Sequence, residues 1–276
     1  MMTEDWFDAT PQVRLYERRL VPETPPLAHA VIVHGYGDHC SRYEWTMNQF
    51  CRAGIATYTY DQRGHGRSPG KRGYIPCFED FLDDLDVFLE HIKDTLTEAP
   101  LFLMGHSMGG MVLARYAETR TLHVRGLIFS SPFLAFSEEV PRFLVALGPI
   151  IARVLPRLPV SKVDNRGLSR DPAVIKAADN DPLCYHGGVA AHTAGEFYRM
   201  IQTIEGDAHR IDSPMLVLHG GSDHIVSPSG SKILHEKARS TDKTLQLYPD
   251  GYHELFNDLE KEAFMAGIIA WIKARL

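Results

Sequence analysis

The feature that most constrains this chain is the run GHSMG at residues 105–109, which follows the apolar segment LFLM and continues into the segment Met108–Tyr116. A short apolar run predicts a buried strand, and the spacing after it predicts a helix. A serine between two glycines at such a junction sits on a tight turn that pushes its hydroxyl outward. The pattern therefore predicts that Ser107 is an exposed nucleophile. The alternative is a chance match in a glycine-containing loop.

Strands and helices are expected to alternate over most of the chain. Alternation of this kind implies βαβ units and a mostly parallel sheet. The first expected strand, Val13–Leu20, alternates loosely and predicts a sheet edge. The other expected strands cover 29–33, 56–60, 101–104, 127–130, 215–218 and 244–248, and the expected helices cover 41–51, 78–92, 108–116, 229–237 and 255–272.

The alternation of strands and helices stops after Pro132. Residues 133–207 contain several Pro and Gly and show no clear strand. This segment is expected to be a helical cap inserted after the sixth strand. The remaining residues, 1–132 and 208–276, would form the α/β core. Ligands bind at the carboxyl ends of the strands in such sheets, so the cap would cover the site.

A serine nucleophile needs a base, and the base needs a carboxylate that holds it. In this kind of fold the acid follows the serine in the chain and the histidine comes last. Asp223 directly follows a predicted strand, which places it on the same rim as Ser107. Asp250 lies only three residues before His253, and Asp212 precedes a strand and belongs on the opposite rim. The remaining candidates lie in the cap region: Asp164, Asp171 and Asp181.

His253 is the expected base, because it follows the last strand and precedes the last helix. His219 and His224 fit the order less well, and His235 falls in a predicted surface helix.

The loop HGYGDH at residues 34–39 follows the first predicted buried strand. Glycines allow a backbone to come close to a substrate. The N–H of Tyr36 is therefore expected to pair with the N–H of Met108, at the start of a helix, as an oxyanion hole. The alternative is that this loop is only a tight turn.

Six motifs occur in order: HGYGDHCSRY, DQRGHGRSPGKRGYI, GHSMGG, NDPL, HGGSDHIV and DKTLQLYPDGYHELFND. Together they resemble the monoacylglycerol lipase and lysophospholipase family of α/β-hydrolases, within the serine aminopeptidase-like hydrolases. The resemblance runs from about residue 29 to the end. It implies an α/β-hydrolase fold with an eight-stranded sheet flanked by helices, and a cap that lines an acyl tunnel.

The same resemblance assigns roles to individual residues. Ser107, Asp223 and His253 match the triad, while Tyr36 and Met108 match the oxyanion donors. Three further residues match the group near the glycerol end of the substrate: Asp38, His39 and Arg42. The family usually has glutamate where this chain has Asp38, and its animal members carry a tyrosine shortly before the NDPL-like stretch, where this chain has none.

The expected activity is hydrolysis of carboxylic esters of single-chain lipids, above all of monoacylglycerol to fatty acid and glycerol, through an acyl-enzyme on Ser107. A lysophospholipase or a general carboxylesterase is the alternative. A non-hydrolytic user of the fold, or a binding protein without activity, is more remote. Neither a cofactor nor a metal is implied.

The net charge and the cysteine spacing bear on whether the chain binds nucleic acid or a metal. The net charge is −6 with both signs scattered along the chain, which argues against nucleic acid. The four cysteines form no C-x-x-C pair and no metal-like spacing. They are expected to be reduced thiols packed as small apolar groups.

The first residues lack a signal-peptide pattern, and no apolar run approaches the ~20 residues that span a bilayer. The protein is therefore expected in the cytoplasm, with peripheral contact to membranes through the cap as a possibility. Part of the apolar set between Phe133 and Leu158 is expected to pack on the core, and the rest to line a tunnel or face lipid.

Overall fold

The structure is a computed structural model, and it describes residues 2–137 and 151–276. Its centre is an eight-stranded sheet with the order β1-β2-β4-β3-β5-β6-β9-β10. β1 and β2 pair antiparallel, as do β2 and β4, and the other pairs are parallel. The strands are β1 (Met2–Thr10), β2 (Val13–Leu20), β3 (Ala28–Val33), β4 (Ile55–Tyr60), β5 (Leu101–His106), β6 (Gly126–Ser130), β9 (Met215–Gly220) and β10 (Lys243–Tyr248).

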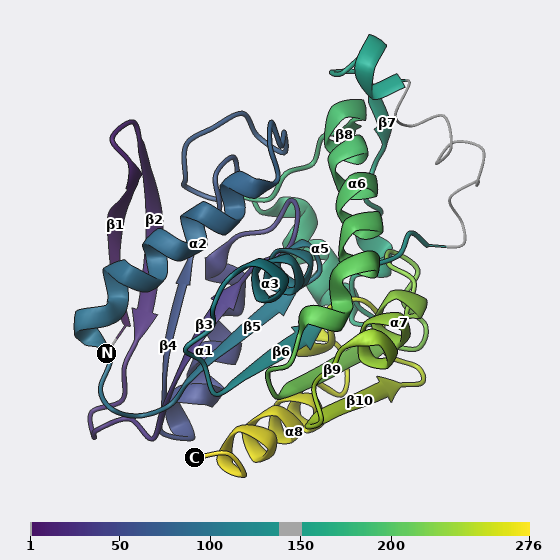
Figure 1. Ribbon diagram of the computed structural model, residues 1–276. Coiled ribbons are helices and arrows are strands. Elements are labelled where there is room, and N and C mark those ends of the chain that lie inside the picture. The colour runs from purple at the N-terminus through teal and green to yellow at the C-terminus, as the bar shows by residue number, and fades with distance from the viewer. Residues whose placement is uncertain (1, 138–150) are drawn as a thin grey trace.

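Helices cover both faces of this sheet (Figure 1). The α-helices outside the insertion are α1 (Glu44–Arg52), α2 (Glu79–Ile92), α3 (Met108–Thr119), α7 (Ser229–Lys237) and α8 (Lys261–Lys273). Short 3₁₀ turns join several elements: η1 (Cys40–Tyr43), η2 (Lys93–Thr95), η3 (Asn165–Gly167), η4 (Ala208–Arg210) and η5 (Leu255–Asn257). These positions confirm the predicted α/β-hydrolase fold.

Each central strand is buried on both sides, because successive side chains point to opposite faces. In β5, Leu103 joins a core with α2 and α3, whereas Phe102 and Met104 join a second core with α1 and α8. The continuous apolar runs in the sequence follow from this two-sided burial.

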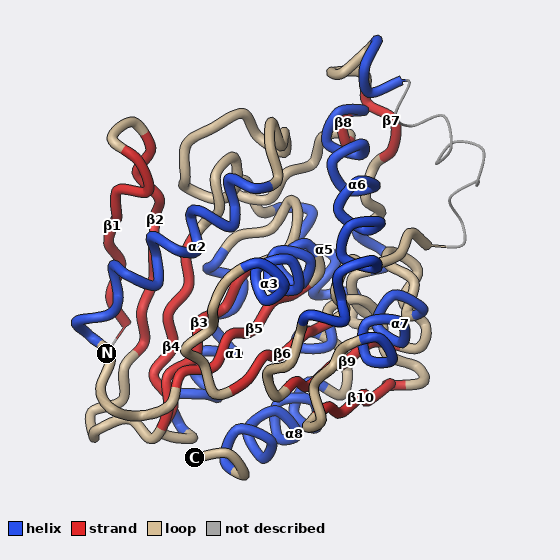
Figure 2. The backbone as a smooth tube through the Cα atoms, in the orientation of Figure 1, coloured by secondary structure: helices blue, strands red, loops and turns tan. Residues whose placement is uncertain are grey.

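Between β6 and β9 the chain leaves the sheet. This insertion contains α5 (Pro172–Asn180), α6 (Ala191–Asp207) and a two-stranded antiparallel ribbon of β7 (Pro159–Ser161) and β8 (Val189–Ala190). The expectation of no strand here was wrong, since strands of two or three residues are too short to show periodicity. The tube view shows the ribbon at one end of α6 (Figure 2). The boundaries of the cap, 133–207, stay a prediction.

The sheet edge also differs from the expectation. Val13–Leu20 is the second strand, and β1 lies outside it. Among the residues of β1 only Phe7 is buried, and its ring packs on Phe88 at a centroid distance of 5.1 Å. With one buried residue, the strand shows no alternating pattern in the sequence.

All four cysteines are free, but Cys77 is exposed, so they are not all packed as apolar groups. None of the helices in the described ranges has the length and apolar character that crossing a membrane requires. Of the apolar set between Phe133 and Leu158, the part within residues 138–150 lies outside the described residues.

Candidate active site

Ser107 occupies the turn between β5 and α3, with φ 52° and ψ −117°. This left-handed conformation is strained for a residue other than glycine, and such strain concentrates at functional sites. A Cβ on Gly105 would lie 2.4 Å from the carbonyl oxygen of Gly109, and a Cβ on Gly109 would lie 2.0 Å from that of Val33. The two glycines are therefore required by space.

His253, which lines the same cavity as Ser107, forms a buried polar pair with Asp223. The Nδ1–H of His253 donates to Oδ2 of Asp223 at 2.6 Å. The other oxygen, Oδ1, accepts from the N–H groups of Ile225 and Val226, both at 2.9 Å. These bonds fix the carboxylate, and the carboxylate fixes the imidazole so that its Nε2 is left as the basic nitrogen.

Asp223 and His253 each shift the pKa of the other in favour of the charged form. Burial raises the pKa of Asp223, but His253 and His219 outweigh burial and hold that pKa well below its usual range. Burial lowers the pKa of His253, yet Asp223 outweighs it and the net shift is upward. The neighbouring His106 has a pKa well below its ordinary value, chiefly because of burial. It therefore adds no charge at neutral pH.

The alternative acids lie elsewhere. Asp250 and Asp212 are both exposed, and Asp212 pairs with Arg239 at 3.0 Å. His219, which the sequence offered only as a rival base, instead supports the acid, since its Nε2 lies 3.1 Å from Oδ2 of Asp223. Its position four residues before Asp223, at the end of a strand, was the available indication.

The insertion is tied directly to the histidine loop. The N–H of His253 donates to the carbonyl of Gly167 at 3.3 Å, and that of Glu254 to the carbonyl of Leu168 at 2.8 Å. The position of His253 thus depends on the insertion as well as on the core.

The loop after β3 comes very close to the serine. A Cβ on Gly35 would lie 3.2 Å from the Cβ of Ser107. Tyr36 lines the same cavity as Ser107, and its hydroxyl is anchored on the carbonyl of Gly73 at 2.6 Å. Met108 is the first residue of α3, so its N–H has no partner within the helix. Their role as oxyanion donors stays a prediction.

The loop after β4 is hydrogen-bonded to the loop after β3 and so fixes its position. The N–H of Gln62 donates to Nε2 of His34 at 2.9 Å, and Nδ1 of His34 therefore carries the proton that it donates to the carbonyl of Gly35 at 2.8 Å. Asp61 accepts from the N–H groups of Cys40 and Arg67, both at 2.7 Å. Two residues of the DQRGHG motif, Asp61 and Gln62, therefore connect the two loops.

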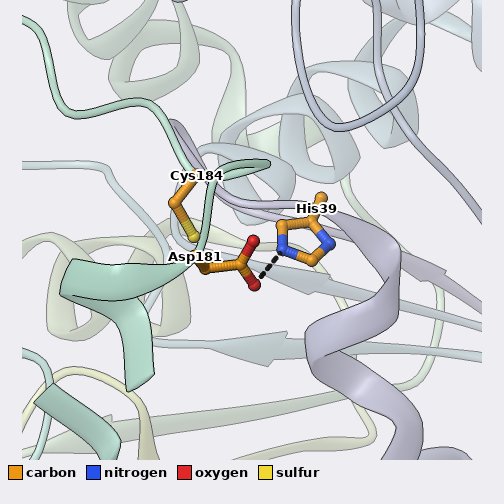
Figure 3. Close-up of side chains that lie close together, drawn as sticks. All are labelled: His39, Asp181 and Cys184. Carbon is orange, nitrogen blue, oxygen red and sulfur yellow. Dashed lines mark hydrogen bonds and ion pairs between the residues drawn. The ribbon is translucent and has the colours of Figure 1, made fainter. Parts of the chain in front are cut away.

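The three residues predicted near the glycerol end lie together but differ in exposure to the cavity. Asp38 and Arg42 line it, whereas His39 is not among its described lining residues. The Nε2–H of His39 instead donates to Oδ2 of Asp181 at 2.9 Å (Figure 3). A direct contact of His39 with substrate stays a prediction.

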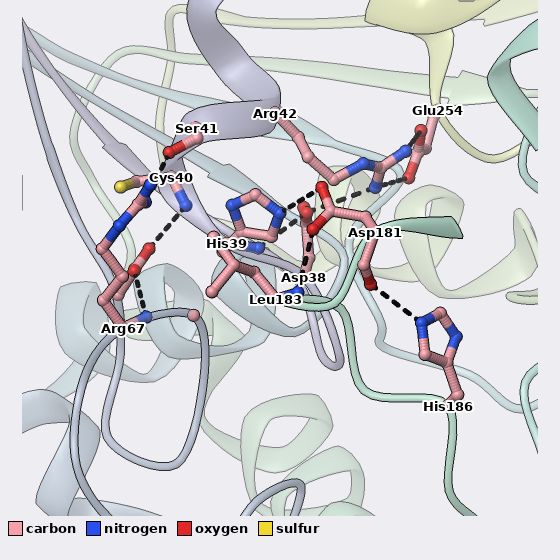
Figure 4. A network of polar contacts seen from close by, with 12 residues as sticks. Asp38, His39, Cys40, Ser41, Arg42, Arg67, Asp181, Leu183, His186 and Glu254 are labelled. Carbon is pink, nitrogen blue, oxygen red and sulfur yellow. Dashed lines mark hydrogen bonds and ion pairs between the residues drawn. The ribbon is translucent and has the colours of Figure 1, made fainter. Parts of the chain in front are cut away.

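Arg42 connects two buried carboxylates (Figure 4). It donates both Nη groups to Glu254, at 2.6 and 2.7 Å, and Nη1 also reaches Asp38 at 3.2 Å. Asp38 further accepts from the hydroxyl of Tyr43 at 2.9 Å. Burial raises the pKa of Asp38, but Arg42 outweighs it and holds that pKa below its usual range. Glu254 was not predicted from the sequence, although it directly follows His253.

Arg42→Met should destabilise the fold, because it leaves the carboxylates of Asp38 and Glu254 buried without a cation. Breaking a buried ion pair in this way costs about 3–5 kcal/mol. Arg239→Met is the control, since that ion pair is exposed and worth about 0–1 kcal/mol. Urea unfolding of both variants measures the difference, and equal losses would contradict a stabilising role for Arg42.

These groups surround one cavity of about 1170 Å³. Ser107 and His253 line it, together with apolar side chains that include Phe133, Phe136 and Phe197. The rings of Phe133 and Phe197 lie 5.1 Å apart, edge to face. The volume exceeds that of most small-molecule sites, which hold roughly 300–1,000 Å³. The cavity therefore has room for a lipid chain beside the serine.

Known proteins share both the sequence and this architecture. Residues 24–260 match the family described as serine aminopeptidase, S33. The monoacylglycerol lipase of Mycolicibacterium smegmatis is 31% identical over 274 residues, covering 99% of this chain and 98% of the relative. The monoglyceride lipase of Rattus norvegicus is 31% identical, covering 95% of this chain and 88% of the relative.

Among solved structures, the monoacylglycerol lipase of Paleococcus ferrophilus superposes with a TM-score of 0.85 at 35% identity, covering 95% of this chain and 99% of that one. The match extends over the sheet and the insertion alike, because nearly all of both chains is covered. The chain therefore belongs to the serine aminopeptidase S33 family of α/β-hydrolases, among relatives of the monoacylglycerol lipases, and it is a serine hydrolase that cleaves carboxylic esters.

Proposed function

We propose that the protein hydrolyses monoacylglycerols to fatty acid and glycerol through an acyl-enzyme on Ser107. The observation that carries this proposal is the placement of Ser107 and of the Asp223-bound His253 in one cavity with both aromatic and charged walls. The relatives named as monoacylglycerol lipases support the same substrate class.

In the first half-reaction, Oγ of Ser107 attacks the ester carbonyl carbon while Nε2 of His253 takes the hydroxyl proton. The carbonyl oxygen becomes an oxyanion, which the N–H groups of Tyr36 and Met108 stabilise. The bond to glycerol then breaks, and His253 returns the proton to the leaving oxygen. In the second half-reaction His253 takes a proton from water, whose oxygen attacks the acyl carbon. The bond between that carbon and Oγ of Ser107 then breaks, His253 returns the proton to Oγ, and the fatty acid leaves.

The two ends of the substrate would meet different walls. The acyl chain would contact Phe133, Phe136 and Phe197, and the glycerol would face Asp38 and Arg42. Asp38 already accepts three hydrogen bonds, so its remaining capacity suits one hydroxyl.

A substrate panel tests the proposal. With monoacylglycerols, lysophospholipids and nitrophenyl esters of matched chain length, kcat/KM should be highest for monoacylglycerols. Higher values for lysophospholipids would favour the lysophospholipase alternative, and indifference to the alcohol part would favour a general esterase.

Catalytic efficiency should rise with acyl length from two to at least eight carbons. Each methylene buried against an apolar wall contributes about 0.8 kcal/mol, or roughly a fourfold gain in kcat/KM. Phe136→Asp should therefore depress hydrolysis of octanoyl esters far more than that of acetyl esters. Leu259→Asp, at an exposed position outside the cavity, is the control. A flat profile, or equal losses on both esters, would show that the aromatic wall only packs the fold.

We also propose that the insertion contacts membrane surfaces. Residues 151–162 carry Arg153, Arg157 and Lys162 but no acidic residue. They expose Val154, Leu155, Leu158 and Val160, with Val154 69% exposed. Exposed apolar side chains among basic ones suit the interface of an anionic bilayer.

Sedimentation with phosphatidylserine vesicles tests this contact. The double substitution Leu155→Glu and Leu158→Glu should reduce the bound fraction several-fold. It removes exposed apolar area and adds negative charge, which the anionic lipid repels. Hydrolysis of a short soluble ester should be unchanged. Wild-type protein that does not sediment with the vesicles would contradict the proposal.

A further inference from the structure

Three potential metal ligands gather beside the serine site. His39 comes from the loop after β3, and Asp181 and Cys184 come from the loop after α5. One ligand atom from each residue lies within 4.8 Å of the other two, and Figure 3 shows the three side chains close together, with the imidazole of His39 facing the carboxylate of Asp181. The sequence did not indicate this cluster, because 142 positions separate His39 from Asp181.

We propose that Nε2 of His39, the carboxylate of Asp181 and the thiolate of Cys184 bind a thiophilic divalent cation of the Zn²⁺ class. Zn²⁺ takes nitrogen, sulfur and oxygen ligands at roughly 2.0–2.3 Å in a tetrahedron. Those bond lengths place neighbouring ligand atoms about 3.4 Å apart, so shifts of about 1 Å complete the site. Three protein ligands leave the fourth position for water.

The ligands are already held in place. His39 is 2% exposed, and its Nδ1 is buried without a hydrogen-bond partner among the described residues. Asp181 is oriented by the N–H of Leu183, which donates to Oδ1 at 2.9 Å, and His186 lies 2.9 Å from its backbone carbonyl. Two of the three ligand atoms, Nε2 of His39 and Oδ2 of Asp181, therefore already lie 2.9 Å apart, and on cation binding the proton of the neutral imidazole moves to Nδ1.

The surrounding charges favour a cation. Asp38 and Glu254 share the single charge of Arg42, and Asp181 adds a third carboxylate, so negative charge is in excess. Arg72, which donates to the backbone carbonyl of Leu183, adds a second positive charge, so the three carboxylates still exceed the cations by one. Burial raises the pKa of the Cys184 thiol to about 12. The bound cation would displace this proton, as metals do at thiol ligands.

Co²⁺ titration of the chelator-treated full-length protein tests the site. One Co²⁺ should bind per chain, with a thiolate-to-metal charge-transfer band and the strong visible bands of a tetrahedral complex, and Zn²⁺ should displace it. Mg²⁺ and Ca²⁺ should not compete, because a thiolate is a poor ligand for hard cations.

Cys184→Ser keeps the side-chain shape and removes the sulfur. It should abolish the charge-transfer band and weaken binding by about a hundredfold or more, because even an outer-sphere change costs 10–100-fold. Cys77→Ser, at an exposed position, is the matched control and should keep the charge-transfer band and the wild-type affinity for Co²⁺. Circular dichroism verifies that each variant is folded.

Two results would overturn the proposal: a wild-type protein without the charge-transfer band at stoichiometric Co²⁺, or a Cys184→Ser variant that binds like wild type. Neither result bears on ester hydrolysis, because the titration requires no turnover.

Discussion

Ser107→Ala should lower kcat for ester hydrolysis by about 10⁶-fold, the loss that follows removal of a serine nucleophile. No other hydroxyl stands at the turn where β5 meets α3, and the oxyanion donors cannot form the acyl bond. The fold should be preserved, because alanine places the same Cβ at the strained φ of 52°. The strain is therefore unchanged.

Steady-state hydrolysis and circular dichroism should be measured on the same preparation of Ser107→Ala, so that a loss of activity can be separated from unfolding. A folded variant that keeps more than a small fraction of the wild-type rate would show that Ser107 is not the nucleophile. Ser131 is the matched control, since it also has a positive φ, of 42°, and it is not among the described residues that line the cavity. Ser131→Ala should keep most of the activity.

Asp223→Asn should lower kcat by about 10⁴-fold. The amide oxygen can still accept from the N–H groups of Ile225 and Val226, which turns the amide NH₂ toward Nδ1 of His253. That nitrogen must then become an acceptor, so the proton moves to Nε2, and His253 can no longer take the proton of Ser107. The fold should lose little.

Asp250→Asn is the control, because Asp250 is exposed. The pH profile of kcat/KM gives a second readout. Asp223 raises the pKa of His253, so the wild-type rate should fall as pH drops through a value above the ordinary ~6.5 of histidine. In Asp223→Asn this acid limb should move to lower pH. Reversed losses for the two aspartates would assign the carboxylate to Asp250.

Much of the fold was predictable because the sheet is buried on both faces. Apolar runs such as LFLM marked β5, and the helix 229–237 was predicted with the bounds that α7 has. Strands that bury few residues and very short elements were not predicted, and one helix was predicted too long. β1 buries only Phe7, β7 and β8 have two or three residues, and the expected helix 255–272 is divided into η5 and α8.

The candidate site divides along similar lines. Chain order and strand ends suffice to bring His253 to Asp223, because the carboxyl ends of parallel strands share one rim. Partners that arrive from the insertion could not be predicted. The N–H of His253 donates to Gly167 and the Nε2–H of His39 donates to Asp181. Each bond joins two segments far apart in the chain, and no sequence pattern relates such segments. Glu254 was missed because a charged residue beside a histidine is usually on the surface.

The most direct test of the account is labelling with a long-chain alkyl fluorophosphonate, followed by peptide mass spectrometry. We expect one adduct per chain on the oxygen of Ser107, loss of ester hydrolysis in proportion to labelling, protection by monoacylglycerol, and strongly reduced labelling in His253→Ala. An adduct on another residue, or full labelling of Ser107 with hydrolysis retained, would contradict the central claim that Ser107 is the nucleophile of this esterase.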